Sequence, residues 1–199
     1  MNRIHALSIC GIAASLVMGV SYATLPGEVV EDFKLVDHTG KTQALYESSS
    51  TRPIVIMIQG NGCPIVRHSV PALKQISDKY GQAVRFLLLN SNLQDNQAAI
   101  AKEVDEFIFP FPVLVDQKQV IGEKLQVQRT SEVFVVDPRT RKLVYRGPID
   151  DRLSYERQRP ATKHYLIDAL DATLAGQAVK VPYADGVGCL VNFPNRLAR

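Results

Sequence analysis

The chain has 199 residues, of which 46% are hydrophobic and 22% are charged, and its formal net charge is +3. A chain of this length and composition can bury the core of one ordinary domain. Lys and Arg are scattered among acidic residues instead of being clustered, so neither nucleic acid nor an anionic membrane is expected as a partner.

The chain begins with the pattern of a secretory signal peptide. A positive charge near the start is followed by apolar residues 6–20, and the small residues Ser21 and Ala23 stand three and one positions before a cleavage point. The apolar run is shorter than the roughly 20 residues of a spanning helix, which favours cleavage over an uncleaved anchor. We therefore predict a signal peptide at 1–23 and a periplasmic or secreted domain at 24–199, with no membrane span after cleavage.

The mature chain then shows a hairpin pattern and a buried strand. Residues 32–45 alternate in polarity around a Gly40-Lys41 turn, which predicts a hairpin. Residues 54–59 form an apolar, largely β-branched run, which predicts a buried strand, and a tight loop with two glycines follows it.

Cys63 stands where this loop meets a predicted helix. Apolar residues from Val66 to Tyr80 recur at three- and four-residue steps, which predicts a helix about five turns long, interrupted by Pro71. The unpaired N–H groups and the positive dipole end of a helix N-terminus favour the thiolate, which is the reactive form of cysteine. We therefore predict that Cys63 is an exposed, reactive thiol and not an inert core residue.

The remaining elements alternate between strands and helices. Asp95 is expected to cap the first of the later helices, and the irregular stretch 181–199 is expected to pack against the domain because it contains several apolar residues. This order predicts an α/β fold with a mixed central sheet, helices on both faces and an irregular C-terminal tail. The later strands are expected at 84–90, 113–115, 132–137 and 142–146, and the later helices at 95–107, 120–125 and 161–174.

Export changes the number of cysteines. Cys10 lies in the predicted signal peptide, so the mature chain keeps two cysteines, Cys63 and Cys189. In an oxidising compartment these two can form one disulfide. The residues alone leave open whether such a bridge is structural or takes part in thiol exchange.

The combination of motifs resembles the thioredoxin superfamily, in its redoxin or alkyl hydroperoxide reductase/thiol-specific antioxidant (AhpC/TSA) branch. The resemblance rests on the Cys-Pro pair at a helix start, on Pro71 eight residues after the cysteine, and on the segments 32–37 and 132–137. It covers roughly residues 25–174. It implies a thioredoxin-like fold and a thiol-disulfide oxidoreductase without a cofactor, with a protein or small-molecule thiol or disulfide as substrate and a thiol-reducing partner.

Three features depart from the family pattern. Val66 replaces the second cysteine of a Cys-x-x-Cys pair, so no local disulfide can form. Ser131 stands where a cis-proline is usual, and because a non-proline cis bond costs about 3 kcal/mol, a trans peptide and a changed substrate groove are expected. Gly60 and Ile56 occupy the positions of the Thr and Pro that peroxiredoxins place before their cysteine, which leaves at most weak peroxidase activity.

The resemblance also suggests which residues form the site. By analogy with two-cysteine peroxiredoxins, Cys189 is the candidate resolving partner of the Cys63 nucleophile. Arg67 is expected either beside the thiolate or as a solvated surface cation, and Glu132 either as a proton acceptor or as a strand-end surface residue. The supporting residues predicted around the thiol are Pro64, Arg67, Thr130, Ser131 and Glu132.

Two alternative functions fit the same residues. A Cu(I)-binding chaperone would use Cys63, Cys189 and His68, with His38 or His164 as further imidazole candidates, since thiolate and imidazole suit Cu(I). Exported copper-delivery proteins with this fold carry a Cys-x-x-x-Cys pair that this chain lacks. The other alternative is a non-catalytic module in which the two cysteines form a structural disulfide.

Overall fold

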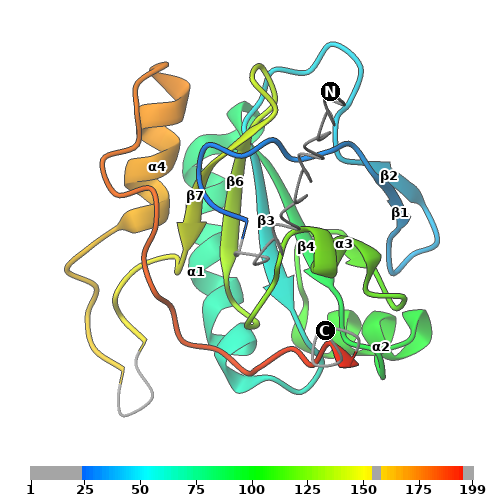
Figure 1. Ribbon diagram of the computed structural model, residues 1–199. Coiled ribbons are helices and arrows are strands. Elements are labelled where there is room, and N and C mark those ends of the chain that lie inside the picture. Colours follow the sequence, from blue (N-terminus) through cyan, green and yellow to red (C-terminus); the bar gives the residue numbers. More distant parts are fainter. Residues whose placement is uncertain (1–23, 154–157, 195–199) are drawn as a thin grey trace, which may run out of the picture.

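The computed structural model of the protein describes residues 24–153 and 158–194 (Figure 1). The predicted signal peptide and the last five residues lie outside these ranges. In the described ranges, no helix combines the length and the apolar character that crossing a membrane requires. The elements are β1 (Lys34–Val36), β2 (Thr42–Ala44), β3 (Ile54–Gln59), α1 (Pro64–Tyr80), the short 3-10 helix η1 (Gly81–Ala83), β4 (Arg85–Asn90), α2 (Gln97–Phe107), β5 (Val113–Val115), α3 (Val120–Lys124), β6 (Val133–Asp137), β7 (Lys142–Gly147) and α4 (Tyr165–Leu174).

A five-stranded sheet in the order β5-β4-β3-β6-β7 forms the centre of the molecule (Figure 1). Strands β3, β4 and β5 run parallel, β6 runs antiparallel to β3, and β7 runs antiparallel to β6. Strands β1 and β2 form a separate antiparallel hairpin in which Lys34 pairs with Ala44. The predicted α/β architecture, with a mixed sheet and an N-terminal hairpin, is confirmed.

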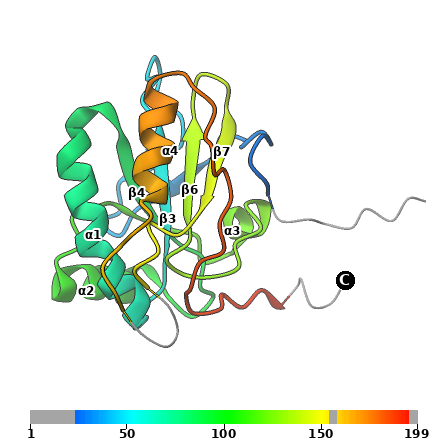
Figure 2. The same cartoon turned by 90° about the vertical axis from the view of Figure 1, so that its left-hand side faces the viewer.

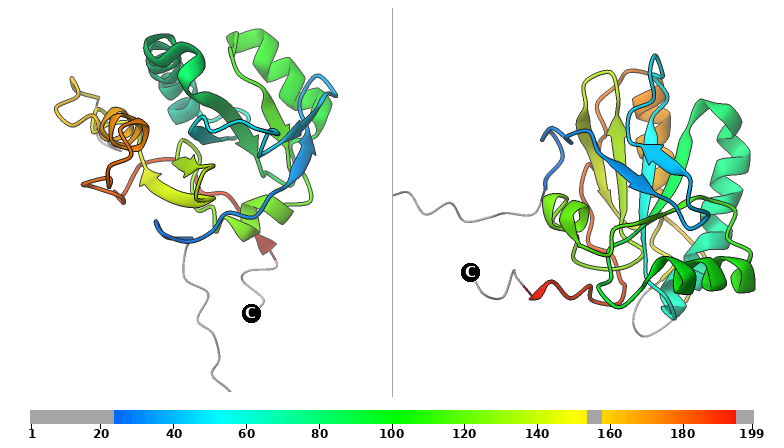
Figure 3. Two further views of the ribbon diagram at one scale, coloured as in Figure 1. Left: turned by 90° about the horizontal axis from the view of Figure 1, so that it is seen from above. Right: turned by 90° about the vertical axis from the view of Figure 1, so that its right-hand side faces the viewer.

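Side chains of the sheet alternate between two cores. Helices α1, α2 and α4 cover one face, and α3 lies on the other face (Figures 2 and 3). Val55 and Met57 of β3 point into the first core, whereas Ile56 points into the second. The second core also contains Val191 and Phe193 of the tail, which confirms that the tail packs against the domain.

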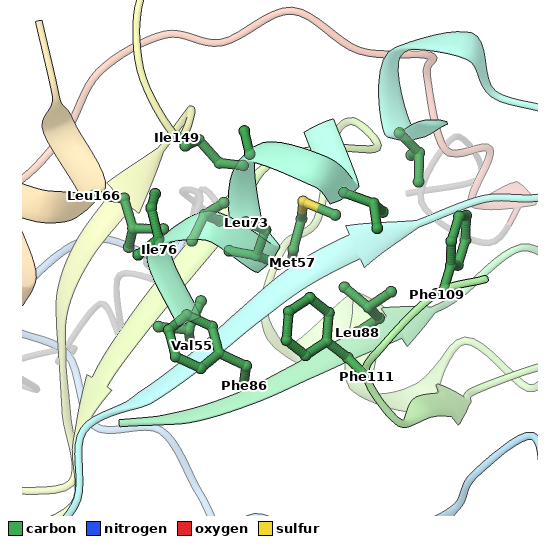
Figure 4. Packing of buried hydrophobic residues seen from close by; sticks show 14 of the residues in the cluster. Val55, Met57, Leu73, Ile76, Phe86, Leu88, Phe109, Phe111, Ile149 and Leu166 are labelled. Atoms are coloured by element: carbon green, nitrogen blue, oxygen red, sulfur yellow. The ribbon is translucent and has the colours of Figure 1, made fainter. Parts of the chain in front are cut away.

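Helix α1 is fixed on the sheet by close apolar packing. Leu73 is fully buried and lies with Ile76 over β3 (Figure 4). Phe86 and Phe111 stack beneath them with ring centroids 5.7 Å apart. The helix continues through Pro71, whose side chain is exposed. This packing fixes where α1 begins, and therefore where Cys63 lies.

Some element ends differ from the prediction. The prediction that Asp95 caps α2 is wrong, because the cap is Asn96, whose side chain accepts the N–H three residues further on at 2.9 Å. Helix α4 begins at Tyr165 and not at residue 161, since the backbone N–H groups of residues 162 and 163 donate to Asp151.

Candidate active site

Cys63 stands between the end of β3 and the start of α1. It is the N-cap residue of α1, and Pro64 follows at the first helical position, where the N–H that proline lacks would have no intrahelical partner. Cys63 is only 4% exposed. The prediction of an exposed thiol is therefore wrong, because Thr130 and Cys189 lie directly against the sulfur.

The tail brings Cys189 to Cys63 from 126 residues further along the chain. The two Sγ atoms are 2.7 Å apart, and both cysteines are free thiols. Thr130 contacts both residues: its Oγ1 lies 3.1 Å from the Cys63 Sγ and accepts the Cys189 N–H at 2.9 Å. Because the hydroxyl accepts from the backbone, its own proton is available to the Cys63 sulfur. Three residues that the sequence singled out thus meet in one cluster.

A short antiparallel pairing holds Cys189 in this place. The Thr130 N–H donates to the Cys189 carbonyl at 2.9 Å, and the Val191 N–H donates to the Gln128 carbonyl at 3.0 Å. The residues between them form an isolated β-bridge. Figure 1 shows the tail, in orange to red, passing the end of the sheet at which β3 finishes. The thiol pair therefore depends on the docking of a segment remote in sequence.

Gly188 permits the close approach of the tail to the loop before β6. A Cβ atom at this position would overlap the carbonyl oxygen of Thr130, which is backbone and has no room to give way. At Gly186, by contrast, a Cβ atom would lie 3.4 Å from the Cβ of Pro148, an ordinary contact. Of these two positions, only Gly188 must be glycine for the tail to dock against the Thr130 loop in this register.

The surroundings of the two thiols shift their pKa values in opposite directions. Burial would raise the pKa of Cys63, but hydrogen bonds from the Cys189 thiol, the Thr130 hydroxyl and the Val66 N–H outweigh it and lower the pKa. The pKa of Cys189 is raised, first by burial and then by its hydrogen bond to Cys63 and repulsion from that thiolate. Cys63 is therefore the thiol that ionises first and the better placed nucleophile.

A buried carboxylate supports the loop before Cys63. Asp95 accepts the Asn61 N–H at 3.0 Å and the side-chain amides of Asn90 and Asn92 at 2.9 Å each. The sequence did not predict this role. The polar run that begins at Asn90, at the carboxyl end of β4, could have indicated it. The neighbouring parallel strand β3 ends at the same edge of the sheet, so this run lies beside the loop that leads to Cys63.

Arg67 is directed toward α2 and not toward the thiol. Its Nε and Nη2 donate to Oε1 and Oε2 of Glu103 at 3.0 and 2.9 Å, and its guanidinium carbon lies 3.7 Å from the ring centroid of Phe107. Glu103, which the sequence did not single out, also accepts the Gly62 N–H at 3.2 Å. Neither predicted role of Arg67 is confirmed, since its charge is paired with a buried carboxylate.

Ser131 has the trans peptide expected in place of a cis-proline. The described residues contain no cis peptide bond, and Ser131 has a left-handed φ of 64°. Its hydroxyl lies 2.5 Å from that of Ser69 on α1. Both serines line a cleft of about 200 Å³ between α1, the loop before α4 and residues 185–187. This cleft therefore lies directly beside the loop that carries Thr130 and the trans peptide of Ser131.

Glu132 is committed to an ion pair. Its Oε1 accepts from Nε of Arg146 at 2.6 Å, and the Arg146 side chain is 1% exposed. The same guanidinium donates to the carbonyls of Thr24 and Gln126 at 3.1 and 3.0 Å. Glu132 does stand at the start of β6, but its side chain is only 14% exposed and its carboxylate is held by Arg146, so neither the proton-acceptor role nor a surface role at the strand end is confirmed.

The copper alternative lacks a third ligand beside the two thiols in the part of the chain that the structure describes. His68 is exposed, and within residues 24–153 and 158–194 no three His, Cys, Asp or Glu side chains are placed to hold a metal ion. His38 accepts the Val113 N–H through Nδ1 at 3.2 Å, and His164 is the N-cap of α4. The copper alternative has no support in this arrangement.

Comparisons with known proteins agree with this fold. The model of the AhpC/TSA family matches residues 26–146. No curated protein sequence matches the chain. An uncharacterized conserved protein from Geobacillus kaustophilus is 29% identical, with a TM-score of 0.76, over 85% of this chain and 93% of that one. A hypothetical protein from Sinorhizobium meliloti 1021 is 28% identical, with a TM-score of 0.74, over 86% and 95%.

A more distant structure is the pneumococcal exposed lipoprotein thioredoxin from Streptococcus pneumoniae strain TIGR4. It is 21% identical, has a TM-score of 0.56, and is matched over 73% of this chain and 99% of that one. At this identity the likeness concerns the fold alone. The fold is thus thioredoxin-like, and thioredoxin-like redoxins generally need no cofactor.

Thr130→Val tests the hydroxyl beside the thiol at nearly constant shape. We expect the pKa of Cys63 to rise, because the thiolate loses a hydrogen bond, so the midpoint of its alkylation by iodoacetamide moves to higher pH. Mass spectrometry of the Cys63 peptide measures this profile. Thr173→Val is the matched control, since it removes a buried hydroxyl that donates to Ala169 at the far end of the sheet. An unchanged midpoint in Thr130→Val would contradict this role.

Gly188→Ala tests whether docking of the tail covers the thiol. Because the added methyl group overlaps the Thr130 carbonyl, we expect the stretch of the tail around Cys189 to detach and the plateau rate of Cys63 alkylation to rise about tenfold or more. Gly186→Ala provides the control and should alkylate at the wild-type rate. Equal rates in the two variants would show that docking does not protect Cys63.

Proposed function

The chain belongs to the AhpC/TSA family of thioredoxin-like redoxins, and from this premise we propose that it is an exported thiol-disulfide oxidoreductase in which Cys63 attacks and Cys189 resolves. Family membership supports a general redox function. The two-cysteine mechanism rests on one observation, the 2.7 Å separation of two free sulfur atoms with a hydroxyl beside them. Geometry of this kind allows a disulfide to form with little backbone movement.

The proposed reaction is a two-step thiol exchange. The Cys63 thiolate attacks one sulfur of a substrate disulfide, forms a mixed disulfide, and releases the other substrate sulfur as a thiolate. Cys189, as a thiolate, then attacks the Cys63 sulfur, forms the Cys63–Cys189 disulfide, and releases the second substrate thiolate. The leaving thiolates take up the two protons of the protein thiols. The substrate gains two electrons, and a thiol reductant restores the dithiol.

Access to Cys63 requires movement of the tail. The Cys63 thiol is 4% exposed. Leu190, which follows Cys189 in the tail, is 73% exposed, so its side chain does not hold this part of the tail on the domain. The anchors are Val191 and Phe193, further along the tail. We propose that the short stretch around Gly188 and Cys189 lifts away, while these anchors stay in the core, and that substrate enters from the cleft beside Ser131.

A purely structural disulfide is the competing interpretation of the same pair. A permanent bridge would have a very low reduction potential, below about −300 mV, whereas a working couple would lie closer to the thiol pools of the cell. The raised pKa of Cys189 beside the lowered pKa of Cys63 supports an attacking and a resolving thiol. In a permanent structural disulfide the two cysteines would have equal roles, and a difference between their pKa values would serve no purpose.

Cys189→Ser tests the mechanism directly. With a model disulfide, we expect this variant to accumulate a mixed disulfide on Cys63, because the resolving step is lost, and turnover to fall at least about 100-fold. Cys63→Ser, the control, should form no mixed disulfide. Mass spectrometry of the oxidised wild-type protein should show a Cys63–Cys189 linkage. Two free thiols after oxidation would rule out the two-cysteine mechanism.

Export is a separate part of the proposal, because residues 1–23 lie outside the described ranges. The evidence for it is the signal-peptide pattern of the sequence. We expect the protein recovered from a bacterial periplasm or culture medium to begin at Thr24 by N-terminal sequencing. Recovery of only the full-length chain from the cytoplasm would contradict export and would leave the thiol mechanism unaffected.

A further inference from the structure

We propose that Glu103 is a positioning residue for Cys63, whose buried carboxylate holds the loop before the cysteine and keeps the charge of Arg67 away from the thiolate. The inference rests on the proposed role of Cys63 as a nucleophile. It concerns a side chain on α2, an element that contributes none of the reacting atoms.

The Glu103 carboxylate binds the chain on both sides of Cys63. One residue before the cysteine, the Gly62 N–H donates to Oε1 at 3.2 Å. One helical turn after it, Arg67 donates to both oxygens, at 3.0 and 2.9 Å. The Glu103 side chain is 9% exposed and that of Arg67 is 35% exposed, so the carboxylate end of these charge-assisted hydrogen bonds is shielded from water. A single carboxylate therefore fixes the entry and the first turn of the helix that carries the thiol.

The pairing also decides where the nearest positive charge lies. The Arg67 guanidinium lies against Phe107 and faces the carboxylate, so its charge is largely compensated. The pKa of Arg67 is raised, chiefly by its hydrogen bond to Glu103, and the charges of Glu106 and of the Cys63 thiolate make smaller contributions to the same shift. Arg67 is therefore near enough to influence the thiolate and is restrained by Glu103 from doing so fully.

Two other charged groups near the thiol bind the segments that hold it and not the sulfur itself. Asp95 accepts the Asn61 N–H on the same loop, and Arg129 donates to the Gly188 carbonyl at 3.3 Å on the side of the tail. The groups in direct contact with the sulfur, the Thr130 hydroxyl and the Cys189 thiol, are uncharged donors. Changing the charge of the Glu103–Arg67 pair should therefore change the field at the thiolate without removing its hydrogen bonds.

A charge cycle on the reduced protein tests this role. Glu103→Gln keeps the size of the side chain and leaves Arg67 uncompensated, so the rate of Cys63 alkylation at pH 6, relative to its plateau at high pH, should rise about threefold or more. Arg67→Met leaves the carboxylate uncompensated, so the same ratio should fall. The double variant is neutral and should return close to the wild-type ratio. Normalising to the plateau removes effects of altered access.

The control is Asp105→Asn, which makes the same charge change on an exposed residue of the same helix. Glu106 is unsuitable, because its charge contributes to the raised pKa of Arg67. Asp105→Asn should leave the ratio nearly unchanged. An equal change in Glu103→Gln and Asp105→Asn, or a double variant that departs further than either single one, would overturn the proposal and indicate a general or merely structural effect. Because the readout is ionisation and not turnover, it stays informative if Cys189 proves not to be a resolving cysteine.

Discussion

The contact between Thr130 and the tail is the constraint on which the candidate site depends. The backbone of Thr130 pairs with Cys189, while its side chain lies against both cysteines. This contact thus holds the two sulfur atoms near each other, covers Cys63, and brings the Cys189 thiol and the Thr130 hydroxyl to where both lower the pKa of Cys63. These three properties are often set by different groups, and here they change together whenever the tail docks or leaves.

This arrangement differs from a pair of cysteines within one helical turn. In a Cys-x-x-Cys motif both thiols are held by the same helix, and their separation hardly depends on the rest of the molecule. In this chain Val66 occupies that second position and is fully buried. The partner thiol, Cys189, comes instead from a segment joined to the sheet by a few backbone hydrogen bonds. Neutral donors stabilise the Cys63 sulfur, and the charge of the nearby Arg67 is paired with that of Glu103.

Much of the fold was predictable because it follows from local patterns. The buried run of β3, the helical spacing of α1 and the hairpin near the N-terminus each follow from residues close in sequence. Cys63, Cys189 and Thr130 were also identified in advance. Their identification relied on the helix-start cysteine, on counting cysteines after export, and on the resemblance to a family with a loop at this position.

The directions of the polar side chains were not predictable in this way. Arg67 pairs with Glu103 because α2 packs beside α1, and no periodicity in the sequence records which faces of two helices meet. The local pattern does not show that Asp95 supports a loop and does not cap α2, because caps and loop supports share the same residue types. Cys63 was expected to be exposed because the covering tail is more than a hundred residues away in sequence.

Arg146 connects this chemistry to the stability of the whole domain. Its side chain joins Thr24 and Gln126, and its backbone pairs with residues 182 and 184 of the tail. Arg146 therefore links the N-terminal segment at Thr24, the segment before Thr130 and the start of the tail to the edge of the sheet as one cooperative unit. A change at Arg146 would therefore alter the folding of the domain and the position of the Cys189 thiol at once.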